Sequence, residues 1–144
     1  MLEIEPLIRQ RLQDIPGLIG GVHGIADLTM DIQTAAGKRL PAIFAGCDGY
    51  RVVDDSSPGA VRVAVRWLVI VAVRQVADVV GGTDARAAVS DIATEVMSRL
   101  YRWQPTPQHQ PMMPIQPPPP EYASGLLLLP MAYESYKIIL CRQE

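Results

Sequence analysis

The chain has 144 residues, of which 49% are hydrophobic and 19% are charged, a composition typical of one globular domain and not of a disordered chain. Its formal net charge of -2 at pH 7 leaves no excess of Lys and Arg to displace phosphate counterions. We therefore expect a single domain over residues 1–144 and no specific nucleic-acid partner.

The cysteines and the N-terminus favour a protein made in a cytoplasm. Cys47 and Cys141 define no disulfide framework, and we expect both to be small buried side chains. Glu3 and Glu5 are incompatible with a signal peptide. No uncharged run reaches the roughly 18 residues of a membrane span, so we expect no membrane partner and a protein made in a cytoplasm.

The first segment has the period of a helix. Apolar residues recur at spacings of four, four and three, at Ile4, Ile8, Leu12 and Ile15. Pro16-Gly17 is expected to end this helix. A short strand around residues 18–25 follows, weakened by its glycines, and the polar stretch from Asp27 to Lys38 gives no clear signal.

Residues 41–59 combine strand and turn signals. The run from Pro41 to Ala45 is typical of a buried strand that begins at its proline. Residues 46–59 contain Asp48-Gly49 and Asp54-Asp55-Ser-Ser-Pro-Gly, both typical of turns. Between them, Tyr50 to Val53 is predicted as a further short strand leading into the next element.

Residues 61–74 give the strongest signal in the chain, because every odd position is apolar. Strict alternation with many β-branched residues predicts a strand and excludes an amphipathic helix. On the even positions Leu68, Ile70 and Ala72 form a central apolar patch between arginines. Fourteen residues would span roughly 45 Å, more than a small domain covers easily. This length favours a protein that works by contact with neighbouring subunits.

A second helix is predicted after Gly81-Gly82, with Thr83 or Asp84 as its N-cap. Its apolar face recurs at spacings of three, four, four and three, at Val89, Ile92, Val96, Leu100 and Trp103.

Prolines crowd residues 104–120, which are therefore predicted as an extended surface arm. Pro114-Ile-Gln-Pro117 has the P-x-x-P form of peptides that bind aromatic grooves, an alternative that we rank below a plain connecting arm.

The C-terminal segment is predicted as buried strands, one over Gly125–Pro130 and one over Tyr133–Leu140. The whole chain is then an α+β protein with a mostly antiparallel or mixed sheet. One long central strand, two helices on one face of the sheet and the Pro-rich arm complete this prediction.

Catalytic and metal-binding patterns are scarce. A Cys47–His23 dyad oriented by Asp48 is the best enzymatic hypothesis, although no local signature supports it. His109, among prolines and glutamines, is expected to be exposed. The spacings of zinc sites are absent, and Gly20-Gly21-x-x-Gly24 follows a helix and lacks the lysine of a phosphate loop. We therefore predict no catalytic residues, cofactor or metal.

The segment Leu100-Tyr-Arg-Trp-Gln-Pro105 resembles the end of the second helix in tail terminator (tail completion) proteins of long-tailed bacteriophages. The order of elements from Leu2 to Leu140 is also similar: a helix, a strand of the Pro-Ala-Ile-Phe type, a long central strand, a helix and closing strands. One departure is Arg102, where related chains often place a glycine before the tryptophan.

The resemblance implies a structural virion protein and no enzyme. Such proteins form a ring, commonly a hexamer, that caps the tail tube, stops tail polymerisation and offers a surface for head joining. The implied partners are further copies of the chain, the tail tube protein and the head–tail connector protein. The implied location is the head-proximal end of the tail, after assembly in the host cytoplasm.

Candidate contact groups lie in the turn-rich segment, at the ends of the long strand and on the arm. They are Asp48, Arg51, Asp54, Asp55, Arg62, Arg66, Arg74, Pro114 and Pro117. Two alternatives stay open: a head–tail connector or neck protein, and an enzyme or ligand-binding module built on Cys47, His23 and Asp48.

Overall fold

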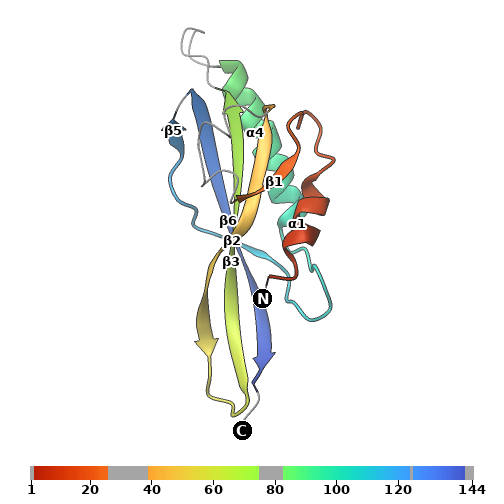
Figure 1. Cartoon of the computed structure of the whole chain (residues 1–144), viewed down its shortest axis with the longest axis vertical. Helices are drawn as coiled ribbons and strands as arrows, with labels where there is room; N and C mark the ends of the chain where they lie inside the picture. The colour runs from red at the N-terminus through yellow and green to blue at the C-terminus, as the bar shows by residue number, and fades with distance from the viewer. Residues whose placement is uncertain (1, 26–38, 75–82, 124, 142–144) are drawn as a thin grey trace.

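A computed structural model describes residues 2–25, 39–74, 83–123 and 125–141. Together these residues form two helices and six strands (Figure 1). In chain order they are α1 (Glu5–Leu12), β1 (Val22–Gly24), β2 (Ala42–Asp54), β3 (Ala60–Arg74), α4 (Thr83–Leu100), β4 (Met113–Ile115), β5 (Glu121–Ala123) and β6 (Leu126–Leu140).

The strands form one mixed, open sheet in the order β1-β2-β3-β6-β4, with β5 also paired to β6. The β1–β2 pair is parallel and all other pairs are antiparallel. The two longest strands, β3 and β6, pair along their whole length, from Ala60 opposite Leu140 to Arg74 opposite Leu126. The predicted α+β class and long central strand are confirmed.

Both helices pack on the face of the sheet formed by the odd residues of β3. Ile4, Ile8 and Leu12 of the first apolar stripe lie in one buried cluster with the apolar face of α4. Trp67 lies at the centre, 1% exposed, and donates its indole N–H to Ser135 Oγ at 3.0 Å. The opposite face has a smaller cluster, made of Ala42, Phe44, Ala72, Leu126 and Leu128.

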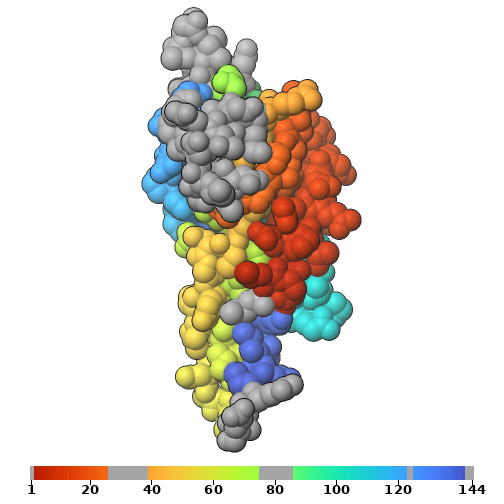
Figure 2. Space-filling view, in the orientation of Figure 1, coloured from red at the N-terminus to blue at the C-terminus, as the bar shows by residue number. Residues whose placement is uncertain are grey.

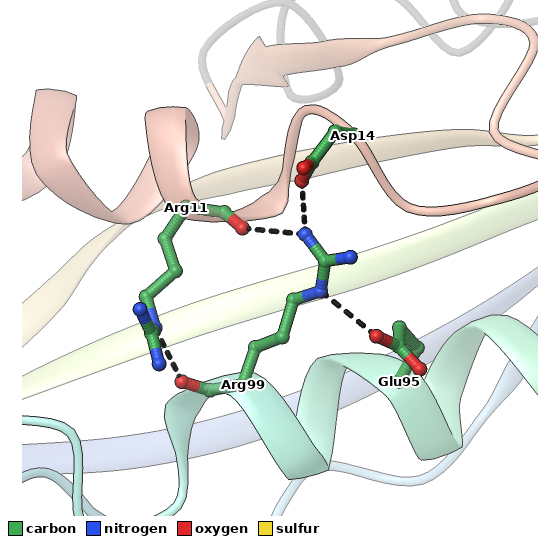
Figure 3. A network of polar contacts seen from close by, with 4 residues as sticks. All are labelled: Arg11, Asp14, Glu95 and Arg99. Atoms are coloured by element: carbon green, nitrogen blue, oxygen red, sulfur yellow. Dashed lines mark hydrogen bonds and ion pairs between the residues drawn. The ribbon is translucent and has the colours of Figure 1, made fainter.

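A reciprocal polar contact joins the C-terminal ends of the two helices (Figure 3). Arg11 donates from Nε to the carbonyl oxygen of Arg99 at 2.6 Å, and Arg99 donates to the carbonyl oxygen of Arg11 at 3.0 Å. Arg99 also pairs with Asp14 and, at 3.0 Å, with Glu95. Each arginine thus satisfies a carbonyl at the end of the other helix, where the helix dipole favours positive charge.

Two predicted boundaries in the sheet are wrong. The predicted break at Asp48-Gly49 is a β-bulge, because Gly49 at φ +107° is inserted between the pairs Cys47–Trp67 and Tyr50–Val65. β2 therefore continues to Asp54, and the chain turns at residues 55–59. The two predicted closing strands are one strand, β6, which passes through Pro130.

The prediction of a surface arm over residues 104–120 is only partly right. Met113–Ile115 forms β4 on the edge of β6, and Met112 beside it is fully buried. His109 is 3% exposed, contrary to expectation, with Nδ1 at 2.6 Å from Thr106 Oγ1. Burial lowers the pKa of this imidazole. The arm therefore closes the core below α4 before it runs exposed through Pro117.

The cysteines are less buried than expected. Cys47 is half-buried against the helix-covered core, and Cys141 is exposed just past the end of β6. The predictions for Asp27–Lys38 and for Gly81-Gly82 fall outside the described residues. No helix in the described part of the chain has the length and apolarity to cross a membrane.

Candidate interaction surface

The lower ends of β2, β3 and β6 reach beyond both helices as a three-stranded ribbon (Figure 1). We define this sheet extension as residues 50–54, 60–64 and 136–140. It exposes five large apolar side chains: Tyr50 at 58%, Val52 at 56%, Val53 at 37%, Ile138 at 60% and Leu140 at 82%. So many exposed apolar groups on one small ribbon are typical of a contact surface.

A network of charged side chains lies on the face of the sheet opposite the helices, where the extension begins. Arg51 donates two hydrogen bonds to Glu134, each at 3.1 Å, and Tyr136 donates a third to the same carboxylate at 3.2 Å. Next to them, Arg66 Nε forms an ion pair with Asp48 Oδ2 at 2.9 Å.

Strand register explains why these side chains share a face. Ala64 lies opposite Arg51 on one side and opposite Tyr136 on the other, and Arg66 lies opposite Glu134. Directly paired residues project to the same face, so three strands contribute to one network. Arg62 extends it by stacking over the Tyr136 ring at 5.0 Å.

Glu134 is the most buried member of this network, at 9% exposed. The hydrogen bonds from Arg51 lower the pKa of its carboxyl group, against the opposing effect of burial. The carboxyl group of Glu134 therefore stays ionised at neutral pH. Its bidentate pair with Arg51 links β2 to β6 across the strand between them, β3.

The structure brings together four of the nine predicted contact residues: Asp48, Arg51, Arg62 and Arg66. Asp54 instead accepts hydrogen bonds from Ser56 at the turn after β2, where the exposed Asp55 also lies. The two hydrogen bonds that Ser56 donates, from its backbone N–H and its hydroxyl, lower the pKa of Asp54.

The other three predicted residues lie elsewhere. Arg74 is at the far end of β3. Pro114 lies in β4, opposite Tyr133 of β6, and Pro117 is exposed further along the arm.

Sequence reasoning missed Glu134 and Tyr136, the β6 members of the network. Their spacing of two, like that of Lys137 and Ile139, marks one face of a strand. Only the register of β6 against β3 shows that this face meets Arg51 and Arg66, and register is not visible in one sequence.

The hypothetical Cys47–His23 dyad is not assembled. His23 lies beside Phe44 in the sheet, with its ring 5.5 Å from the phenyl ring, on the face opposite the helices. Cys47 points to the helix-covered face, because it packs against that core. Asp48 pairs with Arg66 instead. Within the described residues, no group of three or more His, Cys, Asp or Glu side chains is placed to hold a metal ion.

The match that decides the family covers nearly the whole chain. A family model described as phage tail terminator protein matches residues 1–140. The chain belongs to this family. No curated protein matches it. The phage tail terminator family consists of structural proteins and not of enzymes, so a structural role in the phage tail and association with other tail components follow.

Proposed function

We propose that this tail terminator acts as one domain, residues 1–144, that assembles into a homo-oligomeric ring, a hexamer. The ring caps the head-proximal end of the tail tube, ends tail polymerisation and offers its other side to the head–tail connector. Assembly takes place in the host cytoplasm. Family membership supports the tail role, and the finer steps are our proposal.

The observation that supports contact-based action is the sheet extension. A small domain that exposes five large apolar side chains on one ribbon needs a partner to cover them. Stopping a polymer requires only one face that binds the end of the growing tube and another face that does not bind further tube subunits. Geometry is sufficient for that task, and no titratable dyad is needed.

The charged network at the start of the extension supplies candidate contact groups. Asp48, Arg51, Arg62 and Arg66 present both signs of charge over a small area. Complementary charges at such a surface set register and association rate more than affinity. Asp54, Asp55, Arg74, Pro114 and Pro117 are further proposed contact residues, at the turn, at the far end of β3 and on the arm.

The experiment joins solution mass with electron microscopy of tails. The purified protein should sediment as a closed oligomer, and phage lacking this protein should make overlong tails without heads. Tails of normal length that fail to join heads would contradict termination and favour the connector alternative. Normal, head-attached tails would overturn both.

A further inference from the structure

The sheet extension has two outer edges that no described strand covers. On one side, β1 pairs with β2 only from Ile43 to Ala45. On the other side, β4 pairs with β6 only as far as Glu134, and the last described hydrogen bond to this edge runs from Gln110 N to Tyr136 O at 3.2 Å. A free edge is a ready template for a further strand.

The exposed apolar side chains at these edges favour pairing. The charged residues Arg51 and Lys137 on the same strands already have ion-pair partners within the chain. Edges that natural proteins protect from pairing usually carry charged side chains or proline. Here Tyr50 and Val52 on one edge and Ile138 and Leu140 on the other are all more than half exposed. Beside the β6 edge lies a hollow of about 280 Å³, lined by Gln108 and Gln110 on one side and by residues 136–138 and Leu140 on the other. It offers room for an extended chain.

We propose that neighbouring copies join by strand addition, with the outer edge of β2 in one copy pairing to the outer edge of β6 in the next. This inference rests on the ring proposed above and names the contact that holds it. The two edges lie on opposite sides of one ribbon, so each added copy again presents a free edge until the ring closes.

The direction of the new pair follows from the sheet. Both β2 and β6 run antiparallel to β3, and therefore parallel to each other. If the extensions of all copies point the same way along the ring axis, β2 of one copy pairs in parallel with β6 of the next.

Charge complementarity supports a second copy as the occupant. The β2 edge and its turn carry Asp54 and Asp55, both exposed. The hollow beside the β6 edge is lined by two basic side chains, Lys137, which also pairs with Glu3, and Arg62 of β3, which stacks over Tyr136. Acidic and basic groups therefore lie at the two ends that strand addition brings together, which favours this head-to-tail contact over pairing of like edges.

Cross-linking in the assembled protein tests the contact. In a chain with Cys47→Ser and Cys141→Ser, the pair Asp54→Cys and Ile138→Cys is treated with a short bismaleimide reagent. Both residues lie opposite Arg62 and therefore project to the same face of the sheet. We expect a ladder of covalent oligomers up to the full ring, and no ladder from either single variant. The matched control replaces Ile138→Cys by Ile19→Cys, because Ile19 is 58% exposed but lies between α1 and β1, outside the extension.

The outcomes separate this inference from the proposed function. Covalent dimers from a single-cysteine variant would show pairing of like edges and overturn the inference. A ring by mass without the ladder would overturn strand addition while the ring proposal stands. A monomer under all conditions would overturn both.

A charge substitution gives an independent reading. Ile138→Lys should weaken assembly at least tenfold in sedimentation, whereas the equally exposed Ile19→Lys should leave it unchanged. Thermal unfolding of the two variants controls for folding. Equal assembly by both folded variants would overturn the inference.

Discussion

Arg102 has a backbone conformation that favours glycine over residues with a side chain. It follows the end of α4 with φ at +56°, in the left-handed region, where its N–H donates to Met112 O at 2.8 Å. This position after a helix is commonly glycine, since a side chain there costs roughly 1–2 kcal/mol. A glycine in place of Arg102 would therefore have a conformational advantage.

Arg102→Gly should stabilise the protein. We expect the free energy of unfolding in urea to rise by about 0.5–1 kcal/mol, because relief of backbone strain exceeds the extra unfolded-state entropy of glycine. The loss of the contact between Arg102 and the Tyr101 ring is included in this range. The control is Tyr101→Gly, one residue earlier, whose N–H bonds helically to Met97 O, and it should lose about 1 kcal/mol. A less stable Arg102→Gly protein would contradict this account.

The Arg51–Glu134 pair predicts an acid-sensitive contribution to stability. In the folded state, Arg51 lowers the pKa of the Glu134 carboxyl below the unfolded value of about 4.3. The pair therefore stabilises the fold above that pH, and the contribution is lost as pH falls through the folded pKa. Because the Arg51 side chain is 58% exposed, we expect only about 1 kcal/mol at pH 7.

Glu134→Gln should lower stability at pH 7 by that amount and flatten the loss of stability below about pH 4.3. Chemical denaturation across pH measures both effects. Arg51→Gln should give the same flattening, and the double variant should add little to either single one. An unchanged acid limb in Glu134→Gln would show that the pair does not cause it.

At the scale of elements, the Pro-rich arm is the segment whose role changes most between sequence and structure. Met112 and Met113 are neighbours, but the first is fully buried and the second is 36% exposed. Met112→Ala should therefore cost about 2–5 kcal/mol of unfolding free energy, as truncations in cores do.

Met113→Ala, the matched control, should cost less than about 1 kcal/mol, since the side chain is already near solvent. Urea denaturation measures both. Equal small losses would mean that this part of the arm is a plain surface connection and that β4 contributes little.

The elements that sequence predicted well are those with a clear period. The apolar stripe from Ile4 to Ile15 and the alternation of β3 both arise because one face of each element is buried. The spacing of apolar residues in the sequence shows which face that is. The boundaries failed where residues that usually break a strand were accommodated within one. Gly49 adopts its positive φ in a bulge, not in a turn.

Pro130 shows the same limit. It lies in β6 between the stretches paired with β5 and with β4, where the outer edge has no partner among the described residues. Its missing N–H therefore costs no hydrogen bond on that side. The contact between Glu134 and Arg51 could not be predicted from the sequence for a further reason. It depends on the register of three strands, and that register arises from the whole sheet.

The whole molecule is a sheet longer than its helical cover. In the space-filling view the lower part of the molecule is formed by β2, β3 and the end of β6, below the first helix (Figure 2). The length of β3, read from the sequence, already predicted a sheet that extends beyond the helices. Its consequence at this scale is that the surface available for partners is a feature of the fold itself, and no pocket chemistry is needed to explain it.

The last prediction therefore concerns the dyad hypothesis in the assembled phage. Cys47 and His23 point to opposite faces of the sheet, so they cannot exchange a proton directly. The double variant Cys47→Ser with His23→Gln should leave oligomer mass, tail length and head attachment unchanged. The contrasting variant is Ile138→Lys, which should give overlong tails if the extension forms the ring. Normal tails from the double variant and defective tails from Ile138→Lys would establish action by contact. Overlong or headless tails from a folded double variant would show instead that this thiol or imidazole takes part in the function.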